Sequence, residues 1–358
     1  MGLPWRKNRP VILGNRAVAN QNRDIFQQLA AESREDPSKF AIKYVSHAQG
    51  VIALEGKRYL GRFHIGLNAL PADFDEVTKK AFLVSDVLML TQDREGPVTE
   101  LHETGGAPPF LMQGGAGLPS KRWLWGFQCL DTEALGRWLM GAEPLLSHGL
   151  VWYHPQLVKA NISSGSLAVP LGEVGTPVHY DVVVRNGRAV EASGANPIAS
   201  SVARILFTMK IPYIEGVSLE AFSKLTVEEF NSHKLFKTWL RKRILDLDDA
   251  LEDTQSQRKI AAIEEELRHE VAHVQAQMRK ATNDKALATT GAATCVTTVA
   301  LFAVTQPAML SLVTALGINA AGLWNFLTTF AEGGRRKAKA QNGQWFYMWA
   351  LMKDSERL

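Results

Sequence analysis

The sequence predicts an α+β fold, in which a mixed α/β head with antiparallel hairpins is followed by an all-α C-terminal arm. Up to about residue 215, short β-like runs alternate with helical stretches and glycine-containing turns. Beyond Ser218, apolar residues recur at helical spacing over two long stretches, which predicts a long amphipathic helix pair. From residue 286 to residue 331 no side chain carries a formal charge, which predicts an apolar helical hairpin.

The composition is that of a folded chain. At 358 residues the chain is long for one compact core, and 46 % apolar with 21 % charged residues is far from the signature of disorder. Cys129 and Cys295 lack the spacing of a zinc or redox pair, which favours a reducing compartment. The first residues contain no apolar run of signal-peptide length, so we expect a cytoplasmic protein. The expected units are a head (1–215), an amphipathic helix pair (216–285), an uncharged hairpin (286–331) and a basic, aromatic tail (332–358).

The first part of the head is predicted to combine β-like runs with one helix. Residues 40–46 form an apolar β-like run. Polar and apolar residues alternate over 58–67, after the glycine-containing turn at 55–57, which predicts an antiparallel hairpin with one wet face. Residues 73–84 have an acidic first turn and the spacing of a helix, and residues 86–91 form a buried strand.

The rest of the head begins with a glycine- and proline-rich stretch over 92–120, which predicts a long loop. Asp131 is placed to cap a helix that Pro144 interrupts. A short strand is expected over 150–153 and a helix over 197–209. Asn186 and Gly187 form the strongest short hairpin signal, because both residues tolerate positive φ.

Within the helix pair, Thr226 has capping-box spacing to Glu229, which predicts that a helix begins there. Two apolar stripes follow at helical spacing, one through Phe230, Phe236, Leu240, Ile244, Leu247 and Leu251, the other through Ile260, Ile263, Leu267, Val271, Val274 and Met278. Such helices fold back antiparallel, as in a short coiled coil, and bury their stripes. We therefore expect the arm to bind a protein partner or to self-associate.

The uncharged segment has the dimensions of a membrane hairpin. Thr305, Gln306 and Pro307 divide it into arms of 19 and 24 residues, and the shorter arm would be roughly 29 Å long as a helix, close to a bilayer core. Basic residues flank both ends, which keeps both on the cytoplasmic side. The candidate membrane-interface residues are Trp324, Arg335, Arg336, Lys337, Trp345 and Trp349.

The opposing observation is the polar content of this segment. Several threonines in the first arm, with Asn319 and Asn325 in the second, make neither arm as apolar as a committed span. A soluble hairpin buried by neighbouring helices has the same pattern.

His269, Glu270 and His273 match the H-E-x-x-H zinc motif on a helix. No third histidine follows at the required spacing, and both histidines point away from the apolar stripe. We expect them to face solvent, so the sequence assigns no catalytic residue, metal or cofactor, and a zinc hydrolase ranks third among the hypotheses.

The basic cluster at Arg241, Lys242 and Arg243 fits either a solvated helix face or a phosphate-rich surface. With the uncharged segment beside it, an anionic membrane surface is the expected partner, and nucleic acid is not. The sequence thus predicts a non-enzymatic, membrane-engaging protein with a sensing or binding head, such as a conditional pore-forming or membrane-disrupting effector. It would be peripheral or integral at the inner face of the membrane. The alternative is a soluble helical scaffold with a buried hairpin.

Overall fold

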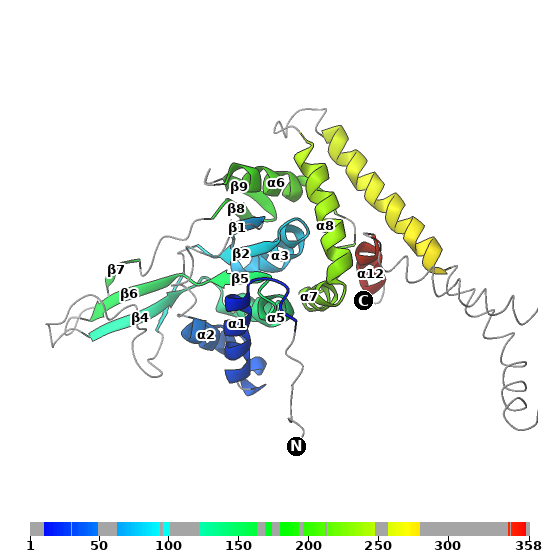
Figure 1. The fold of residues 1–358 in the computed structure, drawn as a ribbon. Coiled ribbons are helices and arrows are strands. Elements are labelled where there is room, and N and C mark those ends of the chain that lie inside the picture. The colour runs from blue at the N-terminus through cyan, green and yellow to red at the C-terminus, as the bar shows by residue number, and fades with distance from the viewer. Residues whose placement is uncertain are drawn as a thin grey trace, which may run out of the picture.

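The computed structural model shows an α+β protein in which helices pack on a mixed five-stranded sheet, beside a four-stranded antiparallel sheet (Figure 1). It describes residues 11–29, 31–48, 63–93, 96–100, 122–162, 169–173, 180–192, 196–211, 213–247, 257–279, 343 and 345–355. The predicted α+β class is therefore confirmed for this part of the chain.

The elements follow one another along the chain in two groups. The first group consists of α1 (Arg16–Gln28), η1 (Ala31–Glu35), α2 (Pro37–Ala48), β1 (His64–Asn68), η3 (Pro71–Asp73), α3 (Phe74–Phe82), β2 (Val87–Thr91), β3 (Val98–Glu100), β4 (Arg122–Gln128), α4 (Thr132–Gly141), α5 (Glu143–Ser147), β5 (Val151–His154), β6 (Leu157–Ile162), β7 (Val169–Glu173), β8 (Val182–Arg185), β9 (Arg188–Ala192) and α6 (Pro197–Thr208). The second group consists of α7 (Leu219–Glu228), α8 (Phe230–Leu245), a helix over 257–279 and α12 (Phe346–Ser355).

The five-stranded sheet has the order β5-β2-β1-β8-β9, and its first four strands are parallel. β1 lies between β2 and β8, with Ile65 opposite Leu88 and Leu67 opposite Val182. The antiparallel pairing predicted for the strand ending at Leu67 is therefore wrong, because both of its neighbours run parallel to it. The remainder of that predicted hairpin, residues 51–62, lies outside the described residues.

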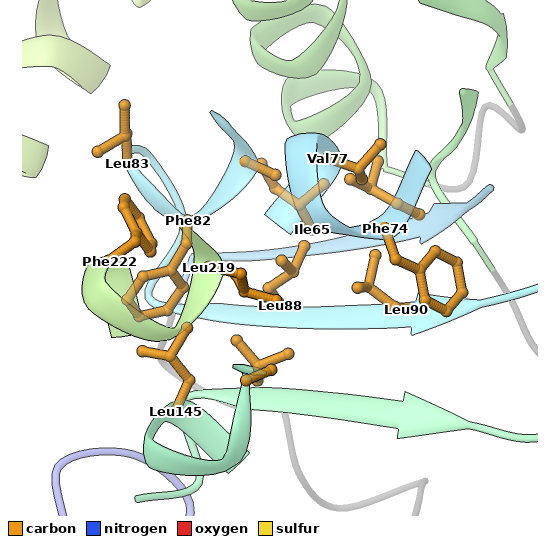
Figure 2. Packing of buried hydrophobic residues seen from close by; sticks show 14 of the residues in the cluster. Ile65, Phe74, Val77, Phe82, Leu83, Leu88, Leu90, Leu145, Leu219 and Phe222 are labelled. Carbon is orange, nitrogen blue, oxygen red and sulfur yellow. The ribbon is translucent and has the colours of Figure 1, made fainter. Parts of the chain in front are cut away.

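The two faces of this sheet are covered by different helices. Leu88 and Val151 belong to the main hydrophobic core, whereas Val87, Met89 and Trp152 alternate with them and pack with Val18 of α1. Figure 2 shows how α3, α5 and α7 meet above the first face, where Phe82, Leu145, Leu219 and Phe222 converge on the strands. Burial on both faces explains why the β2 sequence is a continuous apolar run.

The four-stranded sheet has the order β3-β4-β6-β7 and is antiparallel throughout. Its strands extend away from the body of the molecule (Figure 1). β3 falls at 98–100, inside the stretch predicted as one long loop, so that prediction is wrong there; residues 101–121 lie outside the described residues.

Local sequence signals explain several elements. Asp131 caps α4 by accepting a 2.8 Å hydrogen bond from the Ala134 amide, and Pro144 lies in the first turn of α5. Asn186 and Gly187 have φ values of 50° and 70° and form the turn between β8 and β9, as predicted.

The β-like run predicted over 40–46 is wrong, because these residues lie in α2. The buried side chains of α2 follow the spacing of one helix face: Phe40, Ala41, Tyr44, Val45 and Ala48.

The first helix of the second group begins at Leu219, before the predicted capping box. The Ser218 hydroxyl accepts a 3.2 Å hydrogen bond from the Ala221 amide and caps α7. Thr226 lies inside α7 and donates to the Phe222 carbonyl, so the predicted capping box at Thr226 and Glu229 is wrong. In contrast, Phe236, Leu240 and Ile244 of the first predicted stripe are buried in α8, and the second stripe is buried in helix 257–279. Phe230 is half-buried, Leu247 is buried just after α8, and Leu251 lies outside the described residues.

One hydrophobic cluster joins the sheet to these later helices, since it includes residues of α7, α8, helix 257–279 and α12. Within the described residues, no helix is both long and apolar enough to cross a membrane. The uncharged segment 286–331 lies outside them.

Candidate functional site

The two ends of the interval that contains the uncharged segment meet on the folded body. Helix 257–279 ends just before the interval and α12 begins just after it. Val274 and Met278 of the first helix form a buried apolar cluster with Phe346 of α12. In Figure 1, α12 lies between α8 and the far end of helix 257–279. We call this cluster the hairpin base, and we regard it with its supports on α8 as the candidate site.

α12 is tied to α8 by hydrogen bonds and aromatic packing. The Ser232 hydroxyl accepts a 3.0 Å hydrogen bond from the Tyr347 amide and donates one of 2.7 Å to the Gly343 carbonyl. The Tyr347 hydroxyl donates at 2.7 Å to Thr226 of α7, whose own proton goes to a carbonyl of that helix. Phe236 contacts the Tyr347 ring at a centroid distance of 6.3 Å.

Two of the six predicted membrane-interface residues lie at this base. Trp345 is half-buried, and its ring centroid lies 4.5 Å from that of Trp239 on α8. Trp349 is also half-buried, 5.2 Å from Phe346. The other four, Trp324, Arg335, Arg336 and Lys337, lie outside the described residues. The membrane role of all six stays a prediction.

The face of α8 that meets the head contains a buried charge cluster. Lys237 is 2 % exposed, and its Nζ lies 2.6 Å from the Oδ1 atom of Asp86, in the turn between α3 and β2. Arg241, one turn further along α8, bonds the same carboxylate at 3.2 and 3.3 Å and places its guanidinium 4.6 Å from the centre of the Phe63 ring. We call Asp86, Lys237 and Arg241 the Asp86 cluster.

The pKa values in this cluster are shifted by burial and by charge. Burial disfavours the charge of Asp86, but the two cations outweigh it and hold the pKa of Asp86 at about 2. Burial lowers the pKa of Lys237, and Asp86 only partly opposes the shift. One carboxylate thus balances two cations in a largely desolvated place.

His233 lies one turn before Lys237 on α8 and is fully buried. Its ring stacks on Phe82 of α3 at 5.1 Å with an interplanar angle of 5°, and meets the Tyr347 ring edge-on at 4.8 Å. Among the described residues, neither ring nitrogen has a hydrogen-bond partner. This histidine therefore joins the head, α8 and α12 mainly through ring contacts.

The sequence missed these residues because their signal is weak. His233, Lys237 and Arg241 recur every four residues and share one side of α8, but the neighbouring apolar stripe through Phe236 and Leu240 dominates the pattern. Asp86 comes from a distant turn, and no local pattern identifies it as the partner. Within the predicted basic cluster, Arg241 pairs with Asp86, and Arg243 pairs with Glu266 at 2.9 Å.

The H-E-x-x-H motif lies on helix 257–279, where His269 and His273 are exposed and Val271 between them is buried. His273 contacts Gln277 one turn later at 2.8 Å. The described part of the chain contains no group of three or more side chains placed to hold a metal ion.

A second polar network lies where the parallel strands end. Arg185, at the end of β8, bonds the carbonyl and the side chain of Asn68 at 3.2 and 3.1 Å and pairs with Asp93. Gln156 donates to the Thr91 hydroxyl at 2.8 Å. Ligands of open α/β sheets bind at this edge, but here Arg185 is bonded to Asn68 and Asp93 and Gln156 is bonded to Thr91, so these side chains serve to hold the strand ends together.

An open groove of about 800 Å³ runs between α4, α5 and α7. Arg34, Arg137 and Lys224 line it together with Asp75, Glu143 and Glu220. Arg34 pairs with Glu143 at 2.7 Å, and Lys224 pairs with Glu220 at 2.5 Å. Charges of both signs that pair with one another along a wide opening define no particular ligand.

Comparison of the chain with protein-family models, with curated proteins and with solved structures finds no match. Functional argument therefore rests on the residues of this chain.

Proposed function

We propose that this chain is a non-enzymatic, membrane-engaging protein whose α/β head and amphipathic helices hold the base of an uncharged helical hairpin, residues 286–331. The observation that carries the proposal is the hairpin base, where Met278 and Phe346 pack together on either side of the interval. Because Met278 and Phe346 lie together, the chain between them must return to the same side of any bilayer that it enters. Two crossings satisfy that condition.

The dimensions and flanks of the segment support two crossings. Its arms of 19 and 24 residues are long enough to span as helices. Lys285 precedes the segment, while Arg335, Arg336 and Lys337 follow it, as expected for ends that stay on the cytoplasmic side. An anionic membrane surface is thus the proposed partner, and the inner face of the membrane is the proposed location.

Conditional insertion suits this arrangement better than permanent insertion. The threonines and asparagines of the segment raise the cost of placing it in hydrocarbon, so a folded body that shelters it against protein is the resting state we propose. Release would then make the chain a pore-forming or membrane-disrupting effector, and the head would sense or bind the partner that triggers release.

A soluble helical scaffold is the second candidate, and the exposed apolar side chains of α8 favour it. Leu235 and Leu245 are 48 % and 51 % exposed among the described residues. They offer a surface for self-association or for a protein partner. In this candidate the segment 286–331 stays buried against helices under all conditions.

Vesicle flotation distinguishes the two candidates. The full chain and a variant in which a short Gly/Ser linker replaces residues 286–331 are mixed with vesicles of equal parts phosphatidylcholine and phosphatidylglycerol. Flotation is measured under neutral and under mildly acidic conditions, and we expect the full chain to float in at least one of them while the variant stays at the bottom of the gradient in both. Both proteins should keep the same helix content per residue of folded body. Equal recovery of both proteins at the bottom, under neutral and mildly acidic conditions, would contradict the membrane proposal and leave the scaffold.

A further inference from the structure

His233 is a titratable group enclosed by aromatic rings at the junction of three elements. Phe82 of α3 lies against its face, Tyr347 of α12 meets it edge-on, and Phe230 lies 6.2 Å away on α8. The ring is fully buried, and within the described residues its two nitrogens bond to no protein atom. A neutral imidazole fits this apolar site, whereas an imidazolium there would lack both water and a counter-ion.

The charged groups around this ring come from two elements. Lys237, one turn along α8, opposes a second positive charge, while Asp86 from the α3–β2 turn favours it. Asp86 is already shared between Lys237 and Arg241 at 2.6 and 3.2 Å. The Phe82 carbonyl of α3 faces the ring and favours the charged form, and α12 contributes the hydroxyl of Tyr347, which burial keeps protonated. The Asp86 carboxylate is thus already paired with Lys237 and Arg241, so it is a poor counter-ion for a protonated His233.

We infer that His233 is an acid-sensitive latch that holds α12 on α8 while neutral and releases the hairpin base when protonated. The inference rests on the proposed function, because it supplies the trigger for membrane engagement. Tyr347 and Phe346 are adjacent in the first turn of α12, so a loss of ring packing at Tyr347 acts directly on the contacts of Phe346 with Val274 and Met278.

The direction of the effect follows from proton linkage. Burial and the neighbouring Lys237 depress the pKa of His233 well below its ordinary value near 6.5. The latched state therefore binds fewer protons than the released state at every pH between the depressed and the ordinary pKa. Latching is complete above about pH 6.5 and weakens about tenfold for each pH unit below it, until the depressed pKa is reached.

Hydrogen–deuterium exchange of residues 345–355 in the full chain tests the latch. After correction for the intrinsic pH dependence of exchange, the opening constant of α12 should rise about tenfold between about pH 6 and pH 5. His233→Phe keeps a ring against Phe82 and removes the proton site, so its opening constant should stay flat. His273→Gln, on the exposed face of helix 257–279, is the matched control and should behave like the unmodified chain.

A second measurement keeps the test independent of variant folding. In the unmodified chain with isotope-labelled histidine rings, one imidazole should remain neutral at about pH 6 and become protonated only as α12 opens. An imidazole at position 233 that titrates freely near pH 6.5, or a rise in the opening constant that persists in His233→Phe, would overturn the latch.

Flotation of the same proteins separates this inference from the proposed function. If α12 opens with acid but the full chain never floats with vesicles of phosphatidylcholine and phosphatidylglycerol, the latch stands and the membrane function fails. If the full chain floats equally at neutral and acid pH, with or without His233→Phe, the membrane function stands and the latch fails.

Discussion

Asp86 holds the only carboxylate that faces the two cations on the buried side of α8, as far as the described residues go. Buried ion pairs contribute little net stability relative to apolar packing, but an orphaned buried charge is strongly destabilising. Lys237 is almost fully enclosed, so its ammonium depends on this carboxylate for compensation of its charge. The charge balance at the junction between head and arm therefore depends on the single carboxylate of Asp86.

Asp86→Asn should destabilise the protein by about 2–3 kcal/mol, because it leaves Lys237 and Arg241 without their shared counter-ion. The amide oxygen of Asn can still accept the 3.1 Å hydrogen bond from the Phe63 amide, so the substitution mainly removes charge. The free energy of unfolding in urea is the measurement. Glu133→Gln, which breaks an exposed pair with Arg137 within α4, should change it by less than about 0.5 kcal/mol. Equal effects of the two substitutions would contradict this account.

Asp86 and His233 should make the stability of the protein depend on pH in two separate ranges. The folded state depresses the pKa of Asp86 from 3.8 to about 2, so its contribution is present above about pH 4 and is lost as the pH falls towards 2. Since this carboxylate is only half enclosed, we expect a loss of about 1–2 kcal/mol over that window. Urea titrations across the range should show the loss in the unmodified chain and in His233→Phe, but not in Asp86→Asn. A loss in Asp86→Asn of the same size would assign the window to other groups.

Among the elements, the β8–β9 hairpin shows most directly how sequence determines backbone. Gly187 has a φ of 70°, where a side chain is strained, and Asn186 at 50° tolerates the same region. A Cβ atom on Gly187 would lie 3.0 Å from a carboxylate oxygen of Glu76, which can move aside. Strain in the backbone, rather than lack of space, requires glycine here.

Gly187→Ala should therefore cost about 1–2 kcal/mol in the free energy of unfolding. Asn186→Gly keeps the turn type and should stay within about 0.5 kcal/mol of the unmodified chain. Both values come from urea denaturation at neutral pH. A neutral Gly187→Ala would indicate that the turn has another conformation in solution.

Local signals predicted the elements that depend on local chemistry. The Asp131 cap, the turn at Asn186 and Gly187 and the buried run of β2 all appear where the sequence places them. The same holds for most of the first apolar stripe of the arm and for the whole of the second. The β-like run over 40–46 was misassigned because aromatic and β-branched residues favour strands, although their buried members follow helical spacing. Periodicity was the stronger signal there.

Which strands pair with one another, and in which direction, could not be predicted in the same way. Alternation before Leu67 indicates a strand, but nothing near it specifies that β1 pairs in parallel with β2 and β8. The same limit applies to the candidate site. The environment of His233 and Lys237 is set by Phe82 and Asp86, which lie about 150 residues away in the chain. The tertiary fold brings these residues together, so no local pattern predicts the contacts.

At the scale of the whole molecule, head and arm share one hydrophobic core. Leu219 and Phe222 of α7 pack with Phe82 and Leu145 of the head (Figure 2). Leu267 of helix 257–279 and Met348 of α12 belong to the same cluster. Opening the hairpin base is therefore a local detachment of α12, rather than a separation of two independent domains, and it should leave the sheet intact.

Phe346→Ala tests that local detachment together with the storage of the hairpin. Phe346 is 4 % exposed and packs with Val274 and Met278, so its truncation leaves a cavity between α12 and helix 257–279 and should weaken the docking of α12 by about 2–4 kcal/mol. If the hairpin base restrains the uncharged segment, this variant should float with anionic vesicles at neutral pH, where the unmodified chain floats poorly. Leu245→Ala, at an exposed position on α8, is the matched control and should leave flotation unchanged. Faster hydrogen exchange of α12 without any gain in flotation would mean that the hairpin base stabilises the fold but does not restrain residues 286–331. The soluble scaffold would then be the better supported of the two candidate functions.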